Sequence, residues 1–257
     1  MHPVLFNFGS WTIRSYDVVL CLATITGFFM VLYEARREGY PGLNLAVGLA
    51  GTVIFALIGA RINGWLFWYD GKISMLGMGK TMAGNGMTAF GGYAGALGFM
   101  ALYSHWRHWN ILILLDILAP VLVLSEGIQR IGCFLNGCCH GRTTSSFFGV
   151  YLPDTLGNWT YRYPTQIITG IFCFLLFVWL WRYRKHKPFN GSILLYTLVL
   201  YHLGRVLIDF MRGDEPIVLG LLSAHQLTSA IITILAAPVL YILLEKRARE
   251  GLSGNKT

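Results

Sequence analysis

The residues best suited to chemistry lie in one short segment, Ser125–Arg142, which reads SEGIQRIGCFLNGCCHGR. It contains an acid, two arginines, an asparagine, three cysteines, a histidine and four glycines. Long apolar runs flank it, so groups that bind anions, metals or protons are concentrated at one point of an otherwise apolar chain. If the protein is an enzyme, we expect this segment to carry much of its chemistry.

The arginines of this chain predict an anion site. Arg130 precedes the Gly-rich turn of the segment, and Arg205 and Arg212 follow further along the chain. Arginine binds phosphate through two parallel N–H groups, and the backbone N–H groups of a Gly-rich turn can approach the same anion. We expect these three arginines to converge on an anionic group such as a lipid phosphate. Glu126 and Asp209 are expected to be the carboxylates that orient them.

The cysteines of the segment allow three interpretations. A disulfide between Cys133 and Cys138 is compatible with an oxidising compartment outside a membrane, and cysteines can also pack as small apolar side chains. A metal site or a catalytic thiol is the third interpretation. Zinc sites usually show repeated CxxC-type pairs, whereas this chain has one cluster, and the vicinal Cys138 and Cys139 do not readily point to one ion. We therefore expect no metal and no cofactor. Cys21 and Cys173 lie in apolar runs and are expected to pack as hydrophobic residues.

Three histidines are candidates for a general base near neutral pH, namely His140, His202 and His225. A lone histidine is more often a structural hydrogen-bonding residue. His140 is the candidate that lies inside the Ser125–Arg142 segment.

The composition around this segment is that of a membrane protein. The chain has 257 residues, of which 55% are hydrophobic and only 12% are charged, whereas soluble domains carry about a quarter charged residues. Several apolar runs approach the roughly 20 residues that span a bilayer as a helix. We predict an all-α polytopic membrane protein in which residues 1–257 form a single domain, without a removable signal peptide.

Seven membrane spans are expected, and an odd number places the two termini on opposite sides. The spans cover about 16–33, 45–69, 87–103, 111–127, 167–181, 192–210 and 222–244. The main basic clusters fall on one side, at 36–37, 107, 182–187 and 246–249, and the positive-inside rule makes that side cytoplasmic. The N-terminus and Ser125–Arg142 are then outside. These loops also explain the formal net charge of +8, so no nucleic-acid partner is expected.

Two features of the second and third spans have a possible link to substrate. Arg61 lies within a span, where a charge is costly, so it should face a cavity or a partner. Gly91 and Gly92 open the third span. They predict either close contact between helices or a surface that faces a ligand, and both alternatives stay open.

The ordered motifs of the chain resemble the prolipoprotein diacylglyceryl transferase family. They extend over nearly the whole chain and are Tyr16, GARINGWLFWY, GMTAFGGYAGA, QRIGCFLNGCCHGR, YPTQI, GRVLIDFMRGDEP and LSAHQLTS. The resemblance implies a seven-span enzyme of the bacterial cytoplasmic membrane. Such an enzyme transfers a diacylglyceryl group from phosphatidylglycerol to the lipobox cysteine of a prolipoprotein and releases glycerol phosphate. Chemically, this transfer requires stabilisation of charge on the departing phosphate and conversion of a thiol into a thiolate.

The resemblance also implies roles for individual residues. Arg130 corresponds to the signature arginine that contacts the lipid phosphate, and Arg212 to the arginine after the sixth span. Tyr16 stands where the family has a functional tyrosine. Asn136 and Gly141 match the asparagine and the glycine of the signature. The expected catalytic residues are therefore Tyr16, Arg130, His140 and Arg212, and the expected substrate-binding residues are Arg61, Gly91, Gly92, Glu126, Asn136, Gly141, Gln166 and Arg205.

Three positions depart from the family pattern. The family's histidine before the paired glycines, often invoked as the base, is Phe90 here, while Cys133 replaces the signature's first asparagine and Cys138 its acidic residue. Because phenylalanine cannot accept a proton, three hypotheses follow. One of the three histidines above acts as the base, the acceptor thiolate forms without a dedicated base, or the chain is a paralogue with a changed acceptor. A non-catalytic lipid-binding membrane protein is the alternative outside the class of enzymes.

Overall fold

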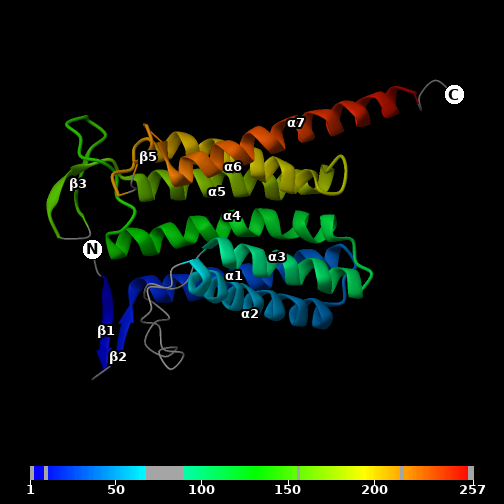
Figure 1. Cartoon of the computed structure of the whole chain (residues 1–257), viewed down its shortest axis with the longest axis horizontal. Coiled ribbons are helices and arrows are strands. Elements are labelled where there is room, and N and C mark those ends of the chain that lie inside the picture. The colour runs from blue at the N-terminus through cyan, green and yellow to red at the C-terminus, as the bar shows by residue number, and fades with distance from the viewer. Residues whose placement is uncertain are drawn as a thin grey trace. The chain divides into compact units, whose positions relative to one another are not determined.

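The computed structural model describes residues 3–8, 11–67, 89–154, 157–214, 217–220 and 222–253. Within these residues the chain forms seven α-helices (Figure 1), which are α1 (Ser15–Arg37), α2 (Gly42–Phe67), α3 (Ala89–Trp106), α4 (Ile111–Asn136), α5 (Thr165–Tyr183), α6 (Ser192–Asp209) and α7 (Ala224–Ser253). Three antiparallel hairpins accompany them, formed by β1 (Val4–Phe8) with β2 (Trp11–Arg14), β3 (Val150–Pro153) with β4 (Trp159–Arg162), and β5 (Ile217–Leu219) with β6 (Leu222–Ser223).

The helices confirm the predicted class of an all-α polytopic membrane protein. Among the described residues, α1, α2, α4, α5, α6 and α7 are long and apolar enough to cross a membrane. The expected third span corresponds to α3, but its predicted first residues, 87–88, lie outside the described residues. The same holds for 68–69 at the predicted end of the second span. The orientation of the helices in the membrane stays a prediction.

The fourth span extends further than the sequence suggested. The predicted end was Gly127, yet α4 continues to Asn136. Glu126 and Arg130 are four residues apart and pair on the same face of the helix, which favours continuation. The helix ends only where Gly137 adopts a positive φ of 78°. Much of the Ser125–Arg142 segment is therefore helical.

By its contacts the chain forms two compact units, one from Met1–Val31 and Leu115–Thr257 and the other from Leu32–Leu114. Whether they act as one domain stays a prediction. In the second unit α2 and α3 pack through glycine. A methyl group at Gly59 would lie 2.3 Å from the carbonyl oxygen of Gly91, and one at Gly92 would contact Ala60 at 3.7 Å. Gly91 and Gly92 therefore both border α2, as expected for close helix contact.

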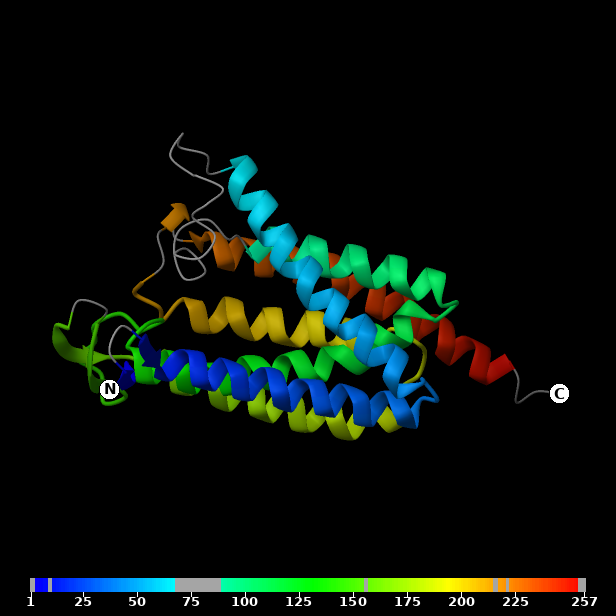
Figure 2. The same ribbon diagram turned by 90° about the horizontal axis from the view of Figure 1, so that it is seen from below.

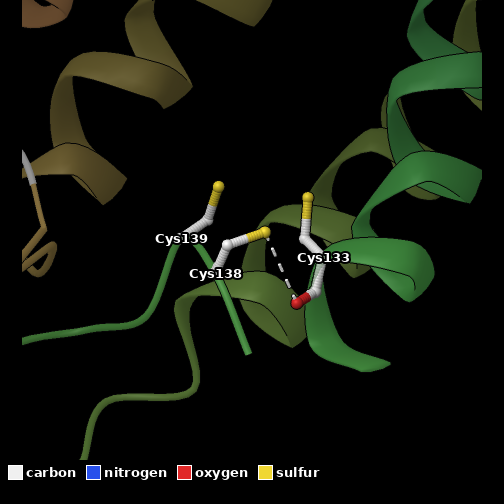
Figure 3. Close-up of side chains that lie close together, drawn as sticks. All are labelled: Cys133, Cys138 and Cys139. Atoms are coloured by element: carbon white, nitrogen blue, oxygen red, sulfur yellow. Dashed lines mark hydrogen bonds between the residues drawn. The ribbon is translucent and has the colours of Figure 1, made fainter. Parts of the chain in front are cut away.

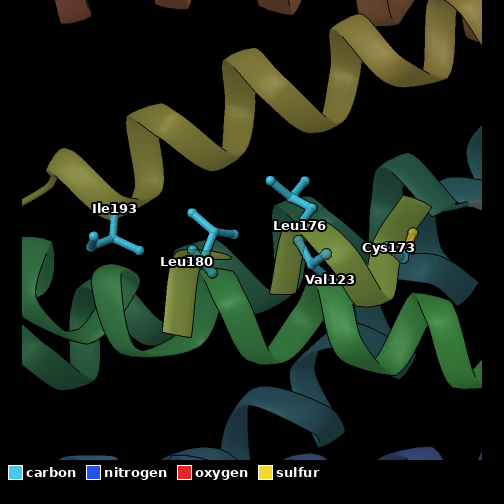
Figure 4. Packing of buried hydrophobic residues seen from close by; sticks show 6 residues of the cluster. Val123, Cys173, Leu176, Leu180 and Ile193 are labelled. Atoms are coloured by element: carbon cyan, nitrogen blue, oxygen red, sulfur yellow. The ribbon is translucent and has the colours of Figure 1, made fainter. Parts of the chain in front are cut away.

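In the first unit α4, α5 and α6 share an apolar core. Its buried residues are Ala119, Val123, Cys173, Leu176, Leu180 and Ile193, most of which Figure 4 labels. Cys173 thus packs as a hydrophobic residue, as expected. Cys21 does not: it is exposed on the surface of α1, because its position in the helix faces away from the core. Figures 1 and 2 show that the β3–β4 and β5–β6 hairpins lie at the end of the unit where α4 ends and α5 begins.

A buried carboxylate fixes the opposite end of the same three helices. Asp116 of α4 accepts hydrogen bonds from the backbone N–H groups of Gly191 at 2.8 Å and Leu194 at 3.0 Å. Its Oδ2 also lies 3.6 Å from the Nζ of Lys187. The carboxylate therefore caps the N-terminus of α6 from a neighbouring helix, where its charge is favourable to the helix dipole.

Replacement of Asp116 by alanine should lower the free energy of unfolding by about 1–3 kcal/mol, because two buried N–H groups lose their acceptor. Thermal unfolding of the purified protein in detergent measures this change. Asp17→Ala is the matched control, since Asp17 is exposed in the first turn of α1. Equal unfolding temperatures for the two variants would show that the cap contributes nothing.

Candidate active site

The C-terminus of α4 places Cys138 beside Cys133. The backbone N–H of Cys138 donates to the carbonyl of Cys133 at 3.2 Å, and that of Gly137 donates to Phe134 at 3.4 Å. With Gly137 in the left-handed conformation, these bonds form a Schellman motif, which reverses the chain over the last helical turn. The Cys138 thiol also points to the Cys133 carbonyl, 3.8 Å away (Figure 3).

Cys139 completes a cluster of three thiols. The Sγ atoms of Cys133, Cys138 and Cys139, hereafter the thiol cluster, all lie within 4.8 Å of one another. The expectation that vicinal cysteines do not face one point is wrong here, because Cys139 adopts a φ of 58°. This left-handed conformation, uncommon outside glycine, redirects its side chain. All three cysteines are free thiols, and Cys133 is only 4% exposed.

The N-terminus of α5 holds the thiol-bearing turn in place. Thr165 Oγ1 donates to the Cys139 carbonyl at 2.8 Å, and Gln166 Nε2 donates to the Cys138 carbonyl at 2.9 Å. Both side chains are almost fully buried. Gln166, expected to bind substrate, thus positions the turn, and Thr165 has the same role although sequence reasoning did not single it out. The YPTQI motif was the signal that could have identified it.

The electrostatics of the turn favour a thiolate at Cys138. The pKa of its thiol is lowered because Cys133 donates a hydrogen bond to it, with further hydrogen bonds from Cys139 and from the side chain of Asn136. Burial acts in the opposite direction. Asn136 therefore contacts the thiol cluster directly, and the lowered pKa of Cys138 favours the thiolate form, which is the form that acts as nucleophile and metal ligand.

The arginines form two groups, each with a carboxylate. On α4, Arg130 pairs with Glu126 one turn away. On α6, Arg205 lies 3.3 Å and the following Arg212 lies 3.8 Å from Asp209 Oδ1. Glu126 and Asp209 thus pair with these arginines, and their role in orienting them toward an anion stays a prediction. Arg212 also binds Asp214 through two bonds of 3.0 Å.

The two groups approach each other around α5. The charges of both Arg130 and Arg205 act on the buried Cys173 in the middle of that helix. Arg130 Nε and Arg205 Nη1 are buried nitrogens without a hydrogen-bond partner among the described residues. Buried N–H groups of this kind are rarely left unpaired.

Tyr16 connects α1 to the same site. Its hydroxyl accepts a hydrogen bond from Gln129 of α4, a residue that the sequence did not single out. A methyl group at Gly132 would lie 3.2 Å from Val19, so α1 approaches α4 closely at this level. Tyr16 also interacts electrostatically with the three cysteines of the thiol cluster.

The turn after the thiol cluster is fixed by backbone contacts. Gly141 donates to the Tyr163 carbonyl at 3.2 Å and forms a β-bridge with Arg212, while Gly213 donates to the His140 carbonyl at 3.2 Å. A methyl group at Gly141 would lie 2.2 Å from the Tyr163 oxygen. His140 is buried, and its Nδ1 lies 3.3 Å from the Gly141 carbonyl. Glycine at position 141 thus allows the turn to lie close to the backbone of Tyr163, where a side chain would not fit.

An apolar groove of about 220 Å³ runs from Arg130 along α4 and α5. Its polar residues are Arg130 and Gln166, and its remaining lining is Gly127, Ile131, Phe134, Ile167, Gly170, Ile171 and Phe174. This groove was not predicted from the sequence, because it depends on which faces of the two helices meet. Its exposed surface is almost entirely apolar, which suits a hydrocarbon chain.

The remaining candidates belong to other helices. Arg61, Gly91 and Gly92 belong to the second unit, as does Phe90 in the first turn of α3. His202 Nδ1 lies 3.2 Å from Ser229 Oγ and connects α6 to α7. His202 thus has the structural contact that a lone histidine commonly makes.

These features define a multi-pass membrane protein that buries arginines and free thiols at one end of its first unit. A model of the family "Prolipoprotein diacylglyceryl transferase" matches residues 3–243, and the chain belongs to this family. Named phosphatidylglycerol–prolipoprotein diacylglyceryl transferases are similar to it over most of their length. The protein from Clostridium tetani is 30% identical over 89% of this chain and 92% of its own. The protein from Clostridium perfringens is 32% identical over 91% of this chain and 92% of its own. The protein from Dehalococcoides mccartyi is 30% identical over 97% of this chain and 96% of its own.

Replacement of Gly141 by alanine should separate the turn from Tyr163 and Arg212, because its methyl group collides with backbone rather than with a movable side chain. We expect a lower unfolding temperature and greater accessibility of the cluster thiols to a maleimide reagent. Gly98→Ala is the matched control, since nothing lies within 4 Å of its added methyl group. Unchanged thiol accessibility in Gly141→Ala would contradict this account of the turn.

Proposed function

We propose that this chain transfers a diacylglyceryl group from phosphatidylglycerol to the lipobox cysteine of prolipoproteins, at the outer face of the bacterial cytoplasmic membrane. One observation carries the proposal beyond family membership: Arg130 lines an apolar groove, and its buried Nε has no hydrogen-bond partner among the described residues. In this proposal both units act as one membrane domain, with the N-terminus outside and the C-terminus in the cytoplasm.

The donor lipid would bind with its phosphate at Arg130 and with an acyl chain along the groove. Glu126 holds the guanidinium in place while leaving Nε unpaired. Departure of glycerol phosphate places additional negative charge on this phosphate. Fixed N–H donors in a dry site stabilise such charge strongly, so Arg130 is the principal catalytic residue of the proposal.

Arg205 and Arg212 would complete the clamp from the α6 side. Their shared carboxylate, Asp209, holds both guanidinium groups near the end of α6. The unpartnered Nη1 of Arg205 supplies a second donor to the same phosphate. Tyr16, held by Gln129, would border the acceptor thiol, and Asn136, His140 and Gly141 would shape the turn beside it.

A specific observation also favours a second candidate function. Cys133 and Cys138 stand where the family signature has an asparagine and an acid, and Phe90 stands where it has a histidine. If the residues that activate the acceptor differ while those that bind the lipid phosphate are kept, the enzyme would use the same lipid donor and a different nucleophile. The two candidates differ only in the acceptor.

Purified protein with phosphatidylglycerol vesicles and a lipobox peptide tests the proposal. We expect release of glycerol phosphate together with a peptide whose thiol gains the mass of a diacylglyceryl group. A peptide with serine in place of the cysteine is the control. Release without lipidation of the peptide would support the second candidate, and lipid binding without any release would support a non-catalytic protein.

In this assay Arg130→Ala should reduce turnover by about 100-fold or more, as expected for the loss of a fixed donor to developing charge. Arg130→Lys should be intermediate, because lysine keeps the charge and loses the bidentate geometry. Arg182→Ala is the matched control, since Arg182 is exposed in the last turn of α5. Unfolding temperatures establish that all variants are folded, and wild-type turnover in Arg130→Ala would refute the phosphate clamp.

A further inference from the structure

The thiol cluster has no role in the function proposed so far. Three thiols from one helix end and the turn after it have their Sγ atoms within 4.8 Å of one another. The Schellman motif, the left-handed Cys139 and the two hydrogen bonds from Thr165 and Gln166 all act on the backbone of this turn. Such convergence of backbone constraints on free thiols indicates a binding site rather than incidental packing.

The dimensions of the cluster fit one zinc ion. Zinc binds thiolate sulfur at about 2.3 Å in a tetrahedral arrangement, so two sulfur ligands on the same ion lie about 3.8 Å apart. The observed limit of 4.8 Å requires only small rotations of the side chains. Thiolate ligands select soft cations such as Zn²⁺, and Asn136 supplies a hydrogen bond to the cluster at Cys138, as partners beyond the ligands commonly do.

A three-thiolate site leaves one position of the tetrahedron open. Structural zinc sites are closed by four protein ligands, whereas sites with three ligands keep the fourth for water or substrate. His140 is not part of the cluster: only the three cysteines form a metal-ligating group among the residues described. Cys138 and Cys139 are also partly exposed, so the fourth position can be reached from outside.

We propose that Cys133, Cys138 and Cys139 bind a Zn²⁺ ion whose open position takes the thiol of the acceptor cysteine. A thiol that coordinates zinc loses its proton outright, so the metal supplies the activation for which Phe90 is unsuited. The identity of this acceptor rests on the proposed function, but the metal site itself does not.

The proposed step is balanced without any oxidant or reductant. The acceptor S–H loses its proton to solvent when the sulfur binds zinc. The zinc-bound sulfur then uses its electron pair to attack the glyceryl carbon of the lipid, and an S–C bond forms. The C–O bond to the phosphate breaks, and its electron pair leaves with glycerol phosphate. The thioether product is a weaker ligand than a thiolate, so it dissociates and the zinc site is regenerated.

The position of the cluster agrees with this step. The charge of Arg130 interacts with both Cys133 and Cys139, and Tyr16 interacts with all three cysteines. The cluster therefore lies within electrostatic reach of the arginine assigned to the departing phosphate. The attacking sulfur and the leaving oxygen have to lie on opposite sides of one carbon. The thiol cluster and Arg130 therefore have to be neighbours without being in contact.

Metal analysis of the purified protein, saturated with zinc and then dialysed, tests the site independently of activity. We expect one zinc ion per chain. Each of Cys133→Ser, Cys138→Ser and Cys139→Ser should weaken zinc binding by at least about tenfold. Cys21→Ser is the matched control, because Cys21 is an exposed free thiol outside the thiol cluster.

Cobalt substitution then identifies the ligands and the open position. Co²⁺ in the site should show thiolate-to-metal charge-transfer absorption, and a lipobox peptide should shift its visible bands as a fourth thiolate binds. The serine peptide should leave the spectrum unchanged. Removal of zinc by a chelator should abolish lipidation of the peptide, and added zinc should restore it in the same sample, which excludes a loss of folding.

The outcomes separate the two proposals. Lipidation that continues in metal-free protein would overturn the activation of the acceptor thiol by zinc and leave the proposed function intact, whereas protein that binds no zinc would overturn the metal site itself. Stoichiometric zinc with a peptide-dependent spectrum but without lipidation would support the site and count against the function. Protein that binds no zinc and has a mass lower by two hydrogens would show a disulfide instead, and Cu⁺ bound in preference to Zn²⁺ would overturn the assignment of the metal.

Discussion

The structure depends on one constraint: a charge buried among apolar helices has to be paired within the protein, because hydrocarbon offers no partner. Arg130 pairs with Glu126 within α4, and Arg205 pairs with Asp209 within α6. Each charge therefore enters the core with a carboxylate four residues away on the same face. The two helices can therefore pack against their neighbours without an unbalanced charge.

The same constraint explains how the two ends of the first unit differ. At one end Asp116 meets backbone N–H groups of α6, and this fully used carboxylate stabilises the packing of the helices. At the other end Arg130 and Arg205 each have a buried nitrogen without a hydrogen-bond partner among the described residues. There the Schellman motif reverses the chain, and three free thiols lie close together after α4. One end thus brings a carboxylate to backbone N–H groups, and the other brings together arginines and thiols.

The departures from the family pattern have a common physical explanation under the two proposals. A phenylalanine removes a residue that could accept a proton, whereas two additional cysteines introduce ligands for a metal that deprotonates a thiol directly. Deprotonation by a base and deprotonation by a metal lead to the same reactive species, a thiolate beside a phosphate held by arginine. Arg130, whose task is unaffected by the choice of route, is retained. The chemistry of the acceptor side can change while that of the donor side is kept.

The sequence by itself determined the class of protein, the helices and the family, because hydropathy, motif order and i,i+4 charge pairs are local properties of the chain. It also singled out Arg130, Gly141, Glu126 and Asp209, whose ion pairs and close backbone contact the structure then shows. Only the tertiary structure decided where α4 ends, that the groove lies between α4 and α5, and that Gln166 holds the thiol-bearing turn. These features depend on which helix faces meet and on the left-handed backbone of Gly137 and Cys139. Residue types alone suggested that neighbouring cysteines diverge, and one positive φ angle made them converge.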